Sequence, residues 1–375
     1  MSDSDLTNAS FKLTSEATDV FAACEATTSK SHRAGAGSIV RGRLRVVACD
    51  IGEGEEVGNA SMEPAGNGPR AIQVVRGKKE RIPTGCEAID RVLRGGVPCG
   101  SVTEIVGEST AGKSQICMQL LLALQRSKSL GGLGGKSLYI HTEGEPPLKR
   151  LKKISEAWVK NGWLPNDSAC FDNLYMENSI RSTEDLCSYL LKVKALLERD
   201  RSEEGRVRLI IIDSIAYLFR DIDGKCKDEV MERSGLLFQV GALLKRYADN
   251  YNISVIVTNH VVDVVDKKVH QAIKEQNTGG FRSFLSSGRR VVPALGLSWA
   301  NCVNTRLFVS RRSQGSQRSN VRDLQIVFAP HLPAGLSCSY TIGTGGLISY
   351  SEDLEEGDIH VHQDHPMKRA RIVIT

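Results

Sequence analysis

The stretch GESTAGKS, residues Gly107 to Ser114, has the pattern GxxxxGKS that is typical of a phosphate-binding loop. It follows a short apolar run, residues 102–106, and precedes apolar residues at helical spacing from Gln115 onward. This is the order of strand, loop and helix in which such a loop works. The stretch therefore predicts an α/β fold and the binding of a nucleoside triphosphate.

Each position of the loop has a physical reason. Gly107 and Gly112 leave the backbone N–H groups free to surround an anion at the N-terminus of a helix. Lys113 is expected to reach the β- and γ-phosphates, and the Ser114 hydroxyl to bind Mg²⁺. The alternative, a glycine-rich turn that only caps a helix, is disfavoured by the flanking strand and helix. The candidate nucleotide contacts are Gly107, Glu108, Ser109, Thr110, Ala111, Gly112, Lys113 and Ser114.

Composition excludes several classes of protein. The chain has 375 residues, of which 41 % are hydrophobic and 25 % charged, as in ordinary soluble globular proteins. No apolar run approaches the roughly 18 to 20 residues of a membrane helix, so we expect no membrane segment. The ten cysteines form no CxxC pair, which disfavours a disulfide scaffold or a zinc site. The net charge is only +5, but basic residues far outnumber acidic ones between Asp263 and Arg322.

The chain divides into three parts by composition. Residues 1–77 are rich in small and polar residues, and we expect them to be largely disordered. Residues 78–350 alternate between strand and helix patterns and form the expected α/β core. Residues 351–375 form a polar tail with a basic cluster at 366–371, which is a candidate nuclear-import signal.

The patterns within the core predict a parallel sheet. Nearly continuous β-branched runs are typical of strands that are buried on both faces, with helices covering the two sides. The expected strands are 137–142, 207–213 and 253–258, and the expected helices are 148–160, 183–199 and 230–247. After Arg290, three strands at 303–309, 321–328 and 337–342 are expected to be antiparallel additions.

Three polar residues follow the predicted strands and are expected beside the loop. Asp213 ends the run VRLIIID and is the candidate second acid for Mg²⁺. Glu143 is the candidate base that polarises the attacking water, with a helix cap as the alternative. His260 is a candidate sensor of the γ-phosphate, with an ordinary hydrogen-bonded polar residue as the alternative.

Four motifs carry a resemblance to a known family. GESTAGKS, YIHTEG (139–144), LIIIDS (209–214) and VIVTNH (255–260), in this order and spacing, resemble the core of the RecA-type recombinase family. The match is to the eukaryotic strand-exchange recombinase and its paralogues, and the segment 83–108 resembles their entry segment. Residues 286–311 and 328–342 narrow the resemblance to one paralogue in its plant-type form. It covers about residues 78–350.

The resemblance implies a fold and a function. The expected fold is a RecA-like P-loop ATPase core, with a central, mostly parallel twisted sheet, helices on both faces and antiparallel C-terminal strands. The expected function is homologous-recombination repair of DNA double-strand breaks in the nucleus, with ATP and Mg²⁺ as cofactors. The expected partners are single-stranded or branched DNA, the C-type recombinase paralogue and the strand-exchange recombinase. Lys113 and Glu143 would serve a weak, DNA-dependent ATPase.

The family binds DNA through two loops. By position the first lies at about 220–229, with Arg220, Lys225 and Lys227 as its cations. The second lies at about 262–292, with Arg282, Arg289 and Arg290 as its cations. Basic, glycine-containing loops are suited to phosphate contacts, and Phe281 and Phe284 are candidates for stacking on bases. The alternative for each is a solvated surface loop.

Two positions depart from the family pattern. Thr110 stands where the strand-exchange recombinase has an arginine that packs on the nucleotide base, and His260 where the family usually has a glutamine. These departures predict a site that holds ATP more readily than it hydrolyses it. They leave open a scaffold that binds ATP without turnover, and fold alone also leaves open a ring-forming RecA-fold helicase.

Overall fold

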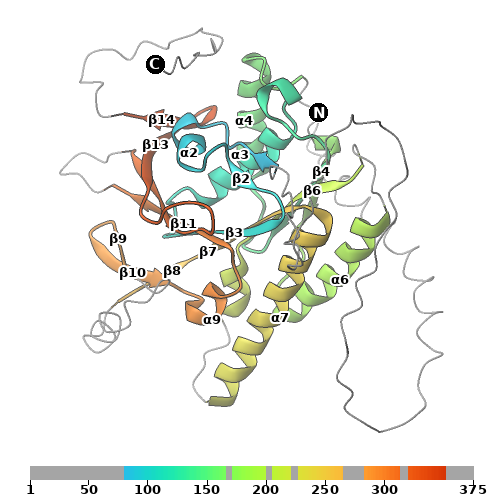
Figure 1. The fold of residues 1–375 in the computed structure, drawn as a ribbon, viewed down its shortest axis with the longest axis vertical. Coiled ribbons are helices and arrows are strands. Elements are labelled where there is room, and N and C mark those ends of the chain that lie inside the picture. The colour runs from blue at the N-terminus through green and yellow to red at the C-terminus, as the bar shows by residue number, and fades with distance from the viewer. Residues whose placement is uncertain are drawn as a thin grey trace, which may run out of the picture. The chain divides into compact units, whose positions relative to one another are not determined.

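The computed structural model describes residues 80–165, 171–199, 205–220, 227–264, 283–312 and 320–351 (Figure 1). Within them, a nine-stranded sheet forms the centre of the fold. Six neighbouring strands are parallel: β11 (Thr305–Arg311), β3 (Ser101–Gly107), β7 (Ser254–Asn259), β6 (Val207–Asp213), β4 (Lys136–His141) and β5 (Leu174–Glu177). Three antiparallel strands extend the sheet beyond β11: β12 (Arg322–Phe328), β13 (Ser337–Gly343) and β14 (Gly346–Tyr350).

The central strands are buried on both faces, as their composition predicted. Successive side chains of a strand point to opposite faces. In β6, Leu209 and Ile211 belong to one hydrophobic cluster, whereas Ile210 and Ile212 belong to a second. β4 and β7 show the same alternation, so both faces of the sheet are apolar. Apolar faces must be shielded from water, and a layer of helices on each face does this.

Two sets of helices provide these layers. Helices α2 (Glu87–Val92), α3 (Lys113–Leu124) and α4 (Leu148–Lys160) contribute to the first cluster. Helices α6 (Thr183–Arg199), α7 (Lys227–Tyr251) and α9 (Gly296–Ala300) contribute to the second. In α6 the buried residues Leu186, Leu190, Val193 and Leu197 recur at helical spacing and form its apolar stripe. The fold class is thus the predicted α/β arrangement.

Smaller elements surround this core. A two-stranded ribbon pairs β1 (Arg81–Ile82) with β2 (Val97–Pro98), and two short 3₁₀ turns are η1 (Lys128–Leu130) and η2 (Ile215–Phe219). A separate three-stranded antiparallel sheet joins β8 (Val261–Asp263), β10 (Arg289–Pro293) and β9 (Phe284–Ser286). None of the helices in the described ranges has the length and apolar character that a membrane crossing requires.

One prediction about strand direction was wrong. The strand at 303–309 was expected to be an antiparallel addition, but β11 runs parallel to β3, with Leu307 opposite Ile105. β11 is antiparallel to β12 on its other side, and the pairs β12–β13 and β13–β14 are antiparallel as well. Direction depends on which strand lies beside β11, and this non-local pairing is not encoded in the residues of β11 itself.

The parallel strands bring the sequence motifs to one edge of the sheet. β3, β6 and β7 are hydrogen-bonded neighbours and run in the same direction, as does β4 beside β6. Their carboxyl ends therefore lie side by side, and the phosphate loop, Glu143, Asp213 and His260 each follow one of these ends. A ligand site at this edge is the usual arrangement in open parallel sheets.

Candidate nucleotide-binding site

The phosphate loop connects β3 to α3 in a conformation that depends on its glycines. Gly112 lies just before α3 in the left-handed region, with φ of 108°. A Cβ atom at Gly107 would lie 2.3 Å from the carbonyl oxygen of Val309, so β11 leaves no room for a side chain there. Thr110 also has a positive φ, 66°, which is uncommon for a residue with a β-branched side chain. The loop backbone is therefore shaped by close packing on β11.

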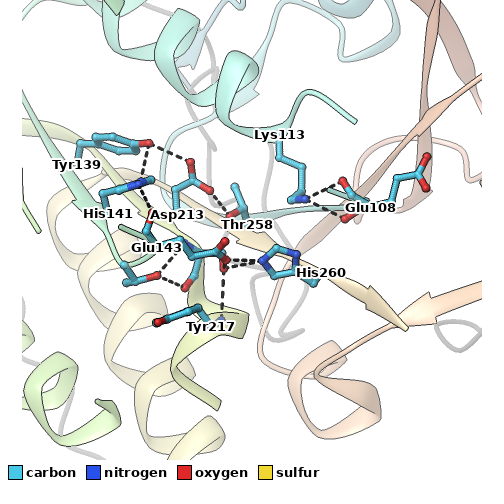
Figure 2. A network of polar contacts seen from close by, with 12 residues as sticks. Glu108, Lys113, Tyr139, His141, Glu143, Asp213, Tyr217, Thr258 and His260 are labelled. Carbon is cyan, nitrogen blue, oxygen red and sulfur yellow. Dashed lines mark hydrogen bonds and ion pairs between the residues drawn. The ribbon is translucent and has the colours of Figure 1, made fainter. Parts of the chain in front are cut away.

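Lys113 is a buried cation inside the loop. The residue is only 7 % exposed, and Nζ donates hydrogen bonds to the carbonyl oxygens of Gly107 (2.9 Å) and Glu108 (3.0 Å). Figure 2 shows the amine turned back onto the loop. Burial lowers the pKa of Lys113, although the carboxylates of Asp213 and Glu143 act in the opposite direction. A desolvated ammonium of this kind is suited to an anionic ligand that replaces the lost water.

Asp213 is held by the strands on both sides of β6. Its carboxylate is buried, and Oδ2 accepts a hydrogen bond from the Tyr139 hydroxyl of β4 at 2.9 Å. Oδ1 accepts a hydrogen bond from the Thr258 hydroxyl of β7 at 2.6 Å. Both donors fix the orientation of the carboxylate at the edge of the sheet, between Tyr139 and Thr258 (Figure 2). These two hydrogen bonds thus pre-position the Asp213 carboxylate at the sheet edge.

Glu143 forms a compact group with Ser214 and His260. The Ser214 hydroxyl donates to Oε1 of Glu143, and Nε2 of His260 contacts the same oxygen (Figure 2). The hydroxyl also lies 3.0 Å from Nε2 of His260. The hydrogen bond with His260, and secondly that with Ser214, lower the pKa of Glu143 to about 2, and they outweigh the opposing effect of burial. His260, the predicted phosphate sensor, is therefore a direct partner of the predicted catalytic base.

These residues enclose a pocket of about 430 Å³. Its volume lies in the range of small-molecule and cofactor sites. The pocket brings together five loop residues with the candidate residues Glu143, Asp213 and His260. The five are Ser109, Thr110, Gly112, Lys113 and Ser114. Five further lining residues were not predicted: Gln115, His141, Arg150, Arg322 and Ile342.

The unpredicted residues come from distant parts of the chain. Arg150 of α4 donates from Nε to Gln115 at 2.9 Å and from its two terminal nitrogens to the carbonyl oxygens of Thr344 and Gly343. It thereby joins α4, α3 and the turn after β13 into one wall. Arg150 follows the YIHTEG motif by a few residues, and this closeness in sequence could have indicated that it lies near the pocket. Arg322 and Ile342 have no local signal, because only the pairing of β12 and β13 with the sheet brings them to the loop.

Glu108 and Ala111 belong to the loop but are not among the residues that line the pocket. Ala111 is fully buried. The Glu108 carboxylate accepts a hydrogen bond from the Ser287 hydroxyl and, at 3.2 Å, from Nη2 of Arg289. Arg289 also donates to both carboxylate oxygens of Asp263, the closer at 2.8 Å. The loop is therefore tied to the sheet of β8, β9 and β10.

The candidate DNA-binding residues are distributed over both predicted loops. Arg220 lies with its guanidinium carbon 5.0 Å from the centre of the Tyr217 ring, and Arg290 donates to the Ser283 hydroxyl at 3.3 Å. Two carboxylates already neutralise Arg289, which makes it a poorer phosphate contact than Arg290. Lys227 begins α7. Lys225 and Arg282 lie outside the described residues, and so does Phe281.

Phe284 has a different neighbour from the one expected. Its ring stacks on that of Phe308 at 4.4 Å, with 20° between the planes. Together with Val106 and Val291 it forms a small hydrophobic cluster between the three-stranded sheet and the central sheet. A ring that is stacked within the protein has one face fewer to offer to a base, so Phe284 acts here as a packing residue.

The donors in the pocket suit a divalent cation with a phosphate chain. The Ser114 hydroxyl and the Asp213 carboxylate are hard oxygen ligands, which Mg²⁺ prefers. They line one pocket with Lys113 and with the N-terminus of α3, which attract anions. A Cβ atom at Gly112 would approach Ile342, Tyr340 and Arg322, so the absence of a side chain there leaves room on the pocket side of the loop. The residues present therefore fit a magnesium-bound nucleoside triphosphate.

Comparison with known sequences agrees with the resemblance drawn from the motifs. The sequence pattern of the Rad51 family matches residues 75–350. The chain is 37 % identical over 287 residues to "DNA repair protein XRCC3 homolog" of Arabidopsis thaliana, covering 71 % of this chain and 92 % of the relative. It is 34 % identical to "DNA repair protein XRCC3" of Mus musculus, covering 72 % and 75 %. "DNA repair protein RAD51 homolog 2" of Mus musculus is 32 % identical, covering 70 % and 73 %.

Proposed function

The chain belongs to the Rad51 family, and from that membership we propose that it is an ATP-binding recombinase paralogue in the homologous-recombination repair of DNA double-strand breaks. The observation that carries the proposal is the pocket in which Lys113, Ser114, Asp213 and Glu143 meet. The relatives named above support the biological setting, since each is a DNA repair protein by name. A nuclear location follows from this role.

The residues of the pocket have separate tasks in this proposal. The loop N–H groups and Lys113 bind the phosphate chain, and Ser114 and Asp213 hold Mg²⁺, directly or through water. Mg²⁺ supplies charge neutralisation of the phosphates when it is bound. Glu143 accepts a proton from the attacking water. Tyr139 and Thr258 keep the Asp213 carboxylate in place, so that the site requires little rearrangement on binding.

Hydrolysis is expected to be slow. A general base works best when its pKa lies near the working pH, and the pKa of Glu143 is lowered to about 2 by His260 and Ser214. A carboxylate engaged by two donors is a weak base and is not free to orient a water molecule. The same observation favours a second candidate function, a scaffold that holds ATP between partners without turning it over.

The proposed partners follow from the family. We propose that the chain assembles with the C-type recombinase paralogue, assists the strand-exchange recombinase, and contacts single-stranded or branched DNA through Arg220, Arg290 and neighbouring cations. Head-to-tail association that buries a nucleotide between subunits makes a stack of defined length or a filament. Contacts to phosphates of this kind do not select a base sequence.

The test is co-purification of the full-length chain with the two recombination partners, with and without ATP, together with ATP binding and turnover in the presence of single-stranded DNA. Lys113→Ala is the test variant, and Lys153→Ala, on the exposed side of α4, is the control. We expect the wild type and the control to bind ATP and partners, and Lys113→Ala to lose ATP. If the chain binds ATP and its partners but does not hydrolyse ATP, the second candidate function, a scaffold, is the correct one. A wild type that fails to bind ATP, or that unwinds duplex DNA alone, contradicts the proposal.

A further inference from the structure

The pocket lining contains an arginine from the C-terminal strands. Arg322 of β12 lines the pocket with Gly112 and Ile342. A Cβ atom at Gly112 would lie 3.4 Å from Cδ of Arg322 and 3.3 Å from the hydroxyl oxygen of Tyr340. Both side chains therefore touch the loop at the point where α3 begins.

Arg322 is the centre of a row of three side chains. Its register partner on β11 is Arg311, and its register partner on β13 is Tyr340. Residues directly opposite each other on antiparallel strands point to the same face of the sheet. Arg311 is exposed, and its Nη1 lies 3.3 Å from the Thr110 hydroxyl. All three side chains thus face the phosphate loop.

This row is electrostatically unfavourable by itself. Like charges directly opposite each other destabilise a pair of strands. Burial lowers the pKa of Arg322, and the nearby charge of Arg311 lowers it further. In the part of the chain that the structure describes, neither arginine forms an ion pair. Arg312, the next residue along the chain, shows the contrast, because it pairs with Asp323 at 2.9 Å.

Two buried donors in the row also lack an acceptor. Nε of Arg322 and the hydroxyl of Tyr340 are both buried and have no hydrogen-bond partner among the described residues. Tyr340 is fully buried as a residue. A buried donor without an acceptor costs free energy, and a bound ion is one of the features that can explain such a donor. An anionic acceptor at this position would satisfy both donors and separate the two positive charges.

We propose that Arg322, assisted by Arg311 and Tyr340, binds the phosphate chain of the nucleotide as a second cationic contact beside Lys113. A guanidinium is suited to this task because it offers several donors in one plane to phosphate oxygens. The inference rests on the proposed function, since it assigns a second cationic contact to the same ATP site. The three residues lie in β11, β12 and β13, outside the four sequence motifs, so the C-terminal strands would also take part in ligand binding.

The test measures the affinity of the full-length chain for two probes, ATP and inorganic triphosphate, by titration calorimetry with Mg²⁺. We expect Arg322→Gln to weaken the binding of both probes about tenfold, Arg322→Lys about threefold, and Tyr340→Phe about threefold. Arg312→Gln, which removes a charge already paired on the same hairpin, is the control and should change neither affinity by more than twofold. Thermal unfolding of each variant checks that the hairpin still folds.

The possible outcomes separate this inference from the proposed function. Wild-type affinity for ATP in Arg322→Gln overturns the inference and leaves the ATP site standing. A loss of affinity for ATP but not for triphosphate also overturns it, because the contact would then be to the nucleoside. A wild type that binds neither probe removes both. If Arg312→Gln weakens binding as much as Arg322→Gln, general charge loss explains the result and the inference fails.

Discussion

The guanidinium of Arg289 donates a hydrogen bond to the carboxylate of Glu108 at 3.2 Å and so links the β9–β10 hairpin to the phosphate loop. Glu108 is 10 % exposed and Arg289 is 56 % exposed, so the pair lies at the boundary between interior and solvent. Arg289 lies at the end of the second predicted DNA loop, and Glu108 lies next to Gly107. Together with the hydrogen bond from the Ser287 hydroxyl, this contact connects the two regions through the Glu108 carboxylate.

The strength of this link can be measured with a double-mutant cycle. We expect Glu108→Gln and Arg289→Gln to show a coupling of about 1 kcal/mol in the free energy of unfolding, since one partner is nearly buried. The exposed pair Glu87 and Arg91 on α2 is the matched control, with an expected coupling below about 0.5 kcal/mol. Urea unfolding of the four chains in each cycle provides the values. Equal coupling in both pairs would argue against a special link.

The close passage of the loop over β11 predicts a strong effect at Gly107. Gly107→Ala places a Cβ atom 2.3 Å from a carbonyl oxygen of Val309, so the backbone must move. We expect a loss of more than about 2 kcal/mol in the free energy of unfolding, together with loss of nucleotide binding. The matched control is Gly235→Ala in α7, where nothing lies within 4 Å of the new atom. There we expect a gain of about 0.5 to 1 kcal/mol. Equal effects would refute the packing argument.

The contact between His260 and Glu143 predicts an effect on turnover. His260→Ala removes the main cause of the lowered pKa of Glu143, so the carboxylate becomes a stronger base. We expect ATP turnover with single-stranded DNA to rise between about three- and tenfold at neutral pH, with little change in the affinity for ATP. Glu143→Gln should abolish turnover in both backgrounds. A fall in turnover in His260→Ala would mean that His260 itself promotes the reaction.

The lowered pKa of Glu143 also predicts how stability depends on pH. A carboxylate with a depressed pKa in the folded state stabilises the protein above its unfolded pKa, near 4.5, and this stabilisation is lost as the pH falls toward about 2. Between pH 6 and pH 3.5 the wild type should therefore lose about 1 kcal/mol more than Glu143→Gln, after allowance for the partial exposure of the carboxylate. Urea midpoints at the two pH values test this. Glu156→Gln, on the exposed side of α4, should behave as the wild type does.

The regular elements of the core could be predicted because their signals are local. The helices at 148–160 and 183–199 and the strand at 207–213 have the predicted bounds, since apolar periodicity and β-branched runs mark them directly. β5 was not predicted, because four residues of mixed polarity, LYME, carry no clear pattern. β9 and β10 form a local hairpin, but the pairing of β8 with β10 joins residues far apart in the chain, such as Val261 and Pro293, and no short window of sequence reveals it.

The residues of the candidate site also fall into those that local sequence could predict and those that depend on non-local packing. Lys113, Asp213, Glu143 and His260 were found because each follows a strand whose end could be located. Arg150, Arg322 and Ile342 were not, since their positions depend on how α4 and the antiparallel strands pack against α3. The partners of His260 and Glu108 could not be predicted either. The sequence locates both residues beside the loop but contains no sign that one would contact Glu143 and the other Arg289.

The position of Ile342 and Arg322 in the pocket has a consequence for genetics. A premature stop or an alternative transcript that ends before β12 would retain all four motifs, GESTAGKS, YIHTEG, LIIIDS and VIVTNH, in their normal order. The resulting protein would nevertheless lack one wall of the pocket and the strands that complete the sheet beside β11. Such an allele would look intact in a motif search and behave as a loss of function, so variants in the last strands should be classified with those in the phosphate loop.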